Sequence, residues 1–119
     1  MHYQERPIKA YMEANRLLML ERPEIPASMI NTLLGAILWG YPRQDEPFTL
    51  KELADRIGLP RTTVSRHLRY LGDFERHGVK GCGWVKVSDY GEDRRQKVVS
   101  MSHKGQNLAL SLMDTLTGR

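Results

Sequence analysis

Apolar residues recur at helical spacing in several segments of the chain. The clearest stripe follows Pro26 and repeats at i, i+3, i+4, i+7 and i+8, which is typical of a helix with one buried face. Its members are Ile30, Leu33, Leu34, Ile37 and Leu38. Residues 7–22 carry a similar period after Pro7, a residue that suits a first helical turn. Residues 102–116 repeat it again behind a capping serine, so both segments are predicted to be helices.

The middle of the chain combines two short helical patterns with a sharp break between them. Thr49 and Glu52 have the spacing of a capping box at the start of the first helix. A small residue, Ala54, lets a second helix cross closely, Gly58 suits the positive φ of a tight turn, and Val64 fills the angle between the helices. Residues 49–74 are therefore predicted to form a helix-turn-helix.

Two strand-like runs follow, at residues 84–87 and 96–101, and a polar turn containing Gly91 joins them. We expect a β-hairpin over residues 84–101. The glycine-rich residues 78–83 are interpreted as a flexible link into it. The predicted fold is mainly α with a small β-hairpin, in the order α-α-α-α-β-β-α, which is a winged helix-turn-helix.

Composition narrows the class of protein. The chain has 119 residues, 40% of them hydrophobic and 27% charged, so residues 1–119 are expected to form one domain. No apolar run is long enough to span a membrane, and the N-terminal residues lack the pattern of a secretory signal. With a single cysteine, we expect a cytoplasmic protein.

The positive charge is concentrated in the middle of the chain. The formal net charge is +4, and residues 49–104 hold 12 basic against 7 acidic residues, whereas residues 1–48 hold 5 against 6. An anionic partner is therefore expected at the helix-turn-helix and hairpin, and double-stranded DNA is the candidate.

The second helix of the motif carries the residues predicted to contact DNA. Arginine forks match guanine O6 and N7 or phosphates, and hydroxyl groups bond phosphates or bases. The predicted contacts are Arg61, Thr62, Thr63, Ser65, Arg66 and Arg69. The alternative interpretation is a solvated helix face without a ligand.

The hairpin is expected to supply a second DNA contact. Arginine at its turn suits a minor groove, whose potential is negative, and an aspartate there would orient an arginine. The predicted wing residues are Lys86, Asp93, Arg94, Arg95 and Lys97. An ordinary charged turn, in which Asp93 caps its own backbone, is the alternative.

Other chemistry has less support. Cys82, His67 and His77 invite a metal or redox site, but their spacing matches no zinc motif, and His67 is expected to pack between helices. The sequence has no nucleophile with a base, no paired catalytic carboxylates and no phosphate loop. We therefore predict no enzyme activity, no metal site and no cofactor.

In these features the chain resembles the MarR family of winged-helix transcription regulators. The resemblance rests on "TLKELADRIGLPRTTVSRHLRYL" from residue 49, on "EDRRQKVVSMSHKG" from residue 92 and on the apolar helix before Thr49. It implies a homodimer on a pseudo-palindromic operator, acting as a repressor, with residues 7–22 and 102–116 as dimerisation helices.

Two departures from the family pattern bear on these expectations. The link between Leu71 and the wing is longer than usual, and little chain follows Leu116. The second departure makes the family's small-molecule effector pocket doubtful here and leaves monomeric binding open. Two further functions also stay open, a protein-binding adaptor and a non-specific DNA-architecture factor.

Overall fold

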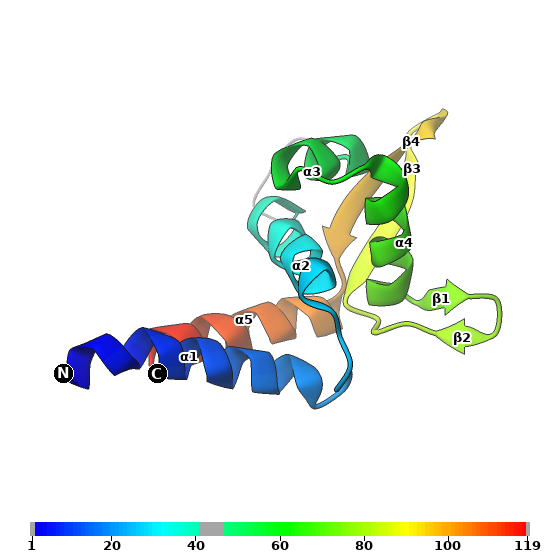
Figure 1. Ribbon diagram of the computed structural model, residues 1–119. Coiled ribbons are helices and arrows are strands. Elements are labelled where there is room, and N and C mark those ends of the chain that lie inside the picture. Colours follow the sequence, from blue (N-terminus) through cyan, green and yellow to red (C-terminus); the bar gives the residue numbers. More distant parts are fainter. Residues whose placement is uncertain (1, 41–46, 119) are drawn as a thin grey trace.

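A computed structural model describes residues 2–40 and 47–118 of the chain (Figure 1). The order of elements confirms the predicted winged helix-turn-helix and adds a small hairpin, β1–β2, between α4 and β3. The elements are α1 (His2–Met19), α2 (Ala27–Gly40), α3 (Leu50–Ile57), α4 (Arg61–Leu71), β1 (Phe74–Arg76), β2 (Val79–Lys80), β3 (Val85–Tyr90), β4 (Asp93–Met101) and α5 (His103–Thr117).

Helices α2, α3 and α4 pack around one apolar core that the β3–β4 hairpin closes. Side chains from all of these elements are almost completely buried, and they include Leu33, Leu53, Val64, Leu68, Leu71, Trp84, Val85 and Val99. The stripe predicted for α2 needs one correction, because Leu38 is 57% exposed. The buried face is rotated toward Thr32, Leu33 and Ala36, since α3 and α4 pack against that side.

Strands β3 and β4 form the antiparallel hairpin expected of a wing. The register runs from Val85 opposite Met101 to Asp89 opposite Lys97, and it shifts between Asp89 and Tyr90. The hairpin is tied to the start of α3, because the Val99 amide donates to the Phe48 carbonyl at 2.8 Å. The wing and the helix-turn-helix therefore share one framework.

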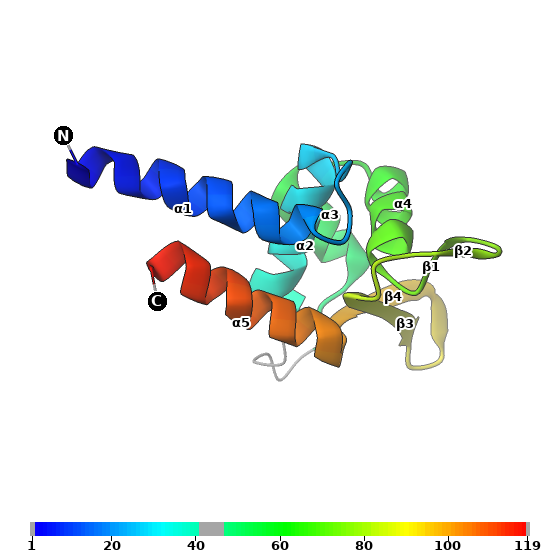
Figure 2. The same cartoon turned by 90° about the horizontal axis from the view of Figure 1, so that it is seen from below.

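Helices α1 and α5 lie side by side and antiparallel, and they project together from the rest of the fold (Figures 1 and 2). The prediction of a first helix over residues 7–22 is wrong at both ends, because α1 begins at His2 and ends at Met19. Pro7 lies inside the helix. It therefore does not mark the first turn of α1. The helix continues through Pro7 because the proline ring has a helical φ, although the residue lacks the amide for one backbone hydrogen bond. In the described part of the chain, no helix has the length and apolarity required to cross a membrane.

The flexible link predicted for residues 78–83 is also wrong. Val79 and Lys80 form strand β2, which pairs with β1 around a turn at Gly78. The following residues bond to the end of α4, where the Cys82 amide donates to the Tyr70 carbonyl at 2.9 Å and the Trp84 amide to the Leu71 carbonyl at 2.8 Å. Of the three glycines in this segment, Gly81 is required by close packing of backbones, whereas Gly78 and Gly83 have a positive φ.

Candidate nucleic-acid interface

The helix-turn-helix is held by the local interactions that its sequence predicted. Thr49 Oγ1 accepts from the Glu52 amide at 3.1 Å, and Glu52 Oε1 accepts from the Thr49 amide at 3.3 Å, which completes the capping box. Gly58 ends α3 at φ 74°, and its amide donates to the Ala54 carbonyl at 2.9 Å. Ala54 and Val64 are buried where the two helices cross.

Helix α4 turns its polar face to solvent, as predicted. Arg61, Thr62, Arg66 and Arg69 are exposed, whereas Thr63 and Ser65 are half-buried. The first turn follows Pro60, which supplies no capping side chain, and contains no acidic residue. Its amides and the helix dipole therefore favour an anion at this end.

A cleft of about 710 Å³ brings this face together with the wing. It lies between the N-terminal turns of α3 and α4 and the strand β4. The lining residues are Thr49, Leu50, Lys51, Glu52, Arg61, Thr62, Ser65, Arg95, Gln96 and Lys97. Four of them are basic and one is acidic, so the cleft suits a polyanion.

Lys51 in this cleft was missed by the sequence analysis. It is exposed in the first turn of α3, and it lines the same cleft as Arg61 and Arg95. The available signal was its place beside the capping residue Thr49, at a helix end that faces the start of α4. Only the crossing of the two helices makes that position part of this surface.

The predicted wing residues do not all lie in the cleft. Arg95 and Lys97 line it, whereas Lys86 is exposed on β3 and does not. Lys97 forms an ion pair with Asp89 across the hairpin. The side chains of Asp93 and Arg94 lie outside the described residues.

The histidine and cysteine that invited a metal or redox site are packed in the fold. His67 is 4% exposed and its Nδ1 lies 2.8 Å from Thr32 Oγ1, so it joins α4 to α2 as predicted. Burial lowers the pKa of His67 and raises the pKa of the Cys82 thiol. In residues 2–40 and 47–118, no three His, Cys, Asp or Glu side chains gather into a group that could hold a metal ion.

Comparisons with known proteins agree with this architecture. A family model described as a helix-turn-helix domain matches residues 32–72. Search of the curated proteins finds no match. Among solved structures, a MepR mutant from S. aureus bound to an oligodeoxyribonucleotide is 19% identical with a TM-score of 0.66, over 98% of this chain and 74% of that chain.

Two further structures show the same similarity. A MarR transcriptional regulator from Methanosarcina mazei is 17% identical, with a TM-score of 0.61 over 98% of this chain and 69% of that one. A mutant MarR from E. coli is 20% identical, with a TM-score of 0.58 over 92% of this chain and 71% of that one. The chain therefore has the winged helix-turn-helix fold of MarR and its structural relatives, as the sequence resemblance predicted.

Proposed function

We propose that the chain is a transcription regulator of the MarR type that binds double-stranded DNA in a sequence-specific manner. The observation that carries the proposal is the cleft in which Arg61 of α4, Lys51 of α3 and Arg95 of the wing line one surface. Cations from three elements on one exposed face suit the regularly spaced phosphates of a duplex. The MepR structure bound to an oligodeoxyribonucleotide supports the proposal by its similar fold.

In this proposal α4 enters the major groove. Arg61 and Arg66 are exposed near its N-terminal end, the end of a recognition helix that usually contacts base edges. The hydroxyls of Thr62, Thr63 and Ser65 would bond phosphates or bases, and Arg69 would contact the backbone. The wing residues Arg94, Arg95, Lys97 and Lys86 would contact the adjacent minor groove, and Asp93 would orient an arginine there.

We further propose that the protein acts as a homodimer through α1 and α5. These helices leave large apolar side chains exposed, and on α1 they follow one stripe. The exposed side chains are Ile8, Tyr11, Met12 and Met19 on α1, Leu20 just after it, and Leu110, Met113 and Leu116 on α5. A second copy would cover them, and its two-fold symmetry would match a pseudo-palindromic operator. A dimer on a promoter would act as a repressor by occupying it.

The proposal assigns no cofactor, metal or catalytic step to the chain. The Methanosarcina mazei structure with this fold is named as a transcriptional regulator, which agrees with the prediction that the chain is not an enzyme. A small-molecule effector is not part of the proposal.

Selection of bound fragments from a random duplex library at physiological salt tests this function. An enriched inverted repeat, with half-sites about 10 base pairs apart, is the expected result. Retention of DNA without enrichment would favour the architectural factor. If no DNA is retained, the proposal fails and the protein-binding adaptor becomes the leading alternative.

Arg66→Ala then tests the role of α4 on the selected site. If Arg66 reads a base, the variant loses about 1 to 3 kcal/mol of binding and its preference at that base pair. Arg76→Ala is the matched control, because it removes the same charge from the exposed strand β1, outside the cleft and the α1–α5 pair. If both variants lose the same binding free energy, Arg66 contributes only through its charge and reads no base.

A further inference from the structure

Residues 80–84, which we call the joint, are bonded along their length to the end of α4. Each amide from Gly81 to Trp84 donates to a carbonyl at or just beyond the helix C-terminus. The bonds are Gly81 to Asp73 at 2.8 Å, Cys82 to Tyr70 at 2.9 Å, Gly83 to Gly72 at 2.7 Å and Trp84 to Leu71 at 2.8 Å. They satisfy carbonyl groups that a helix end leaves open, so the joint moves with α4.

The start of α5 is bonded to the same joint. Ser102 Oγ donates to the Gly83 carbonyl at 2.6 Å, and the Ser102 amide donates to the Trp84 carbonyl at 3.1 Å. A Cβ at Gly105 would lie only 1.9 Å from the Trp84 oxygen. The first turn of α5 therefore packs backbone to backbone on the joint.

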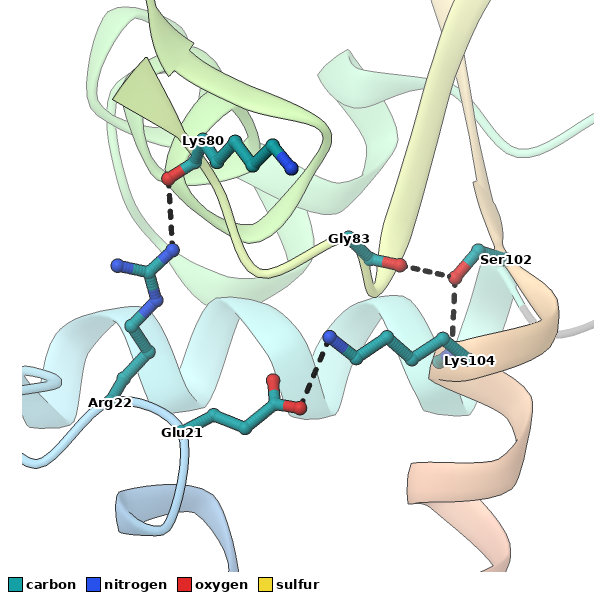
Figure 3. A network of polar contacts seen from close by, with 7 residues as sticks. Glu21, Arg22, Lys80, Gly83, Ser102 and Lys104 are labelled. Carbon is teal, nitrogen blue, oxygen red and sulfur yellow. Dashed lines mark hydrogen bonds and ion pairs between the residues drawn. The ribbon is translucent and has the colours of Figure 1, made fainter.

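Two consecutive residues after α1 complete the connection (Figure 3). Arg22 Nη2 donates to the Lys80 carbonyl at 2.9 Å, and its guanidinium carbon lies 5.3 Å from the centre of the Tyr70 ring of α4. Glu21 Oε1 lies 3.1 Å from Lys104 Nζ in the first turn of α5. Since α1 otherwise packs chiefly on α5, the Arg22 contacts connect the end of α1 to the recognition helix, and the Glu21–Lys104 pair holds the same segment on α5.

We propose that Arg22 is a positioning residue, which fixes α4 relative to the α1–α5 pair and so sets the half-site spacing that a dimer accepts. This inference rests on the proposed function. Each added base pair moves a half-site by about 3.4 Å and turns it by about 34°. A rigid connection between the dimerisation helices and α4 tolerates few spacings, whereas a loose connection tolerates several.

The test compares spacing profiles of the wild-type chain and Arg22→Ala on one half-site sequence, placed in inverted repeats with centres about 8 to 13 base pairs apart. We expect the wild type to prefer its best spacing about tenfold or more over neighbouring spacings, and Arg22→Ala to prefer it about threefold or less. Base preference within the half-site should be unchanged. Arg76→Ala, on the exposed strand β1 and outside both the cleft and the α1–α5 pair, should keep the wild-type profile.

The possible failures are distinguishable. An unchanged profile in a folded Arg22→Ala variant would overturn this inference and leave the proposed function intact. A wild-type chain that binds no DNA, or binds all spacings equally, would overturn the proposed dimeric regulator and the inference with it.

A second measurement needs no DNA and covers the case in which Arg22→Ala folds poorly. A spin label at Asp73→Cys, an exposed position just after α4, reports the distance between the two recognition helices of a dimer. Glu21→Lys should broaden this distance distribution, and adding Lys104→Glu should narrow it again, because the swapped pair restores the attraction. A distribution that none of these changes affects would contradict a positioning role for this connection.

Discussion

Gly58 lies in the turn before α4, and Gly81 lies in the joint that packs on the end of α4. We call these places the first and the second corner. The chain requires glycine at the two corners for different reasons. At Gly58 the backbone has φ 74°, and a Cβ would meet no atom within 4 Å. At Gly81 a Cβ would lie 2.2, 2.6 and 2.9 Å from the carbonyl oxygens of Gly72, Tyr70 and Arg69. The first corner depends on local backbone conformation, and the second on the approach of two distant backbones. Substitutions at the two corners should therefore differ in size and in kind.

The largest effect is expected for Gly81→Ala. Because the added methyl meets backbone oxygens, the joint has to separate from the end of α4. We expect a loss of about 3 kcal/mol or more in the free energy of unfolding, measured by urea denaturation. A loss below about 1 kcal/mol would mean that the corner yields easily, and the contrast with Gly58 would disappear.

Labelling of Cys82 measures the rigidity of the same corner in the unmodified chain. The thiol is 2% exposed, and burial raises its pKa, so both access and thiolate fraction are low. A disulfide reagent should label the native thiol about 100-fold or more slowly than the urea-unfolded thiol. Comparable rates would restore the interpretation of residues 78–83 as a flexible link. Gly81→Ala should accelerate the native reaction.

A smaller effect is expected at the first corner. Gly58→Ala places a side chain in the left-handed region, at a cost of about 1 to 2 kcal/mol in unfolding free energy. Gly58→Asn should cost less, because asparagine tolerates this conformation. Equal losses for the two variants would indicate a packing constraint, and Gly58 would then resemble Gly81.

The smallest effect concerns His67, which lies in α4 between the corners. The folded pKa of His67 is lowered by burial first and by the charge of Arg66 second, whereas an unfolded histidine has a pKa of about 6.5. The unfolded chain therefore takes up this proton more readily, and stability should fall as the pH drops below about 6.5.

Urea denaturation between about pH 7 and pH 5 should reveal this loss of stability from His67. The loss should be absent in His67→Gln and present in His103→Gln, which changes an exposed histidine at the start of α5. If the wild type, His67→Gln and His103→Gln show the same pH dependence of stability, protonation of His67 does not contribute to it.

The candidate interface was predictable to the extent that its parts are local. The capping box at Thr49, the turn at Gly58 and the exposed arc of arginines on α4 each follow from residues within one or two helical turns of one another. Lys51 was not predictable in this way, because it lies on α3 and joins the cleft only where α3 and α4 cross. The pairing of Lys97 with Asp89 likewise required the register of the hairpin.

The sequence by itself determined the helix-turn-helix, the hairpin after it and the polar face of α4. Such features depend on periodicity, caps and turn residues, whose physical effects act over a few residues. Only the tertiary structure decided that residues 80–84 are a packed joint between α4 and α5, and that Arg22 fastens the end of α1 to it. Those contacts join segments far apart in the sequence. The sequence also does not distinguish a glycine required by close backbone packing from a glycine in a mobile loop.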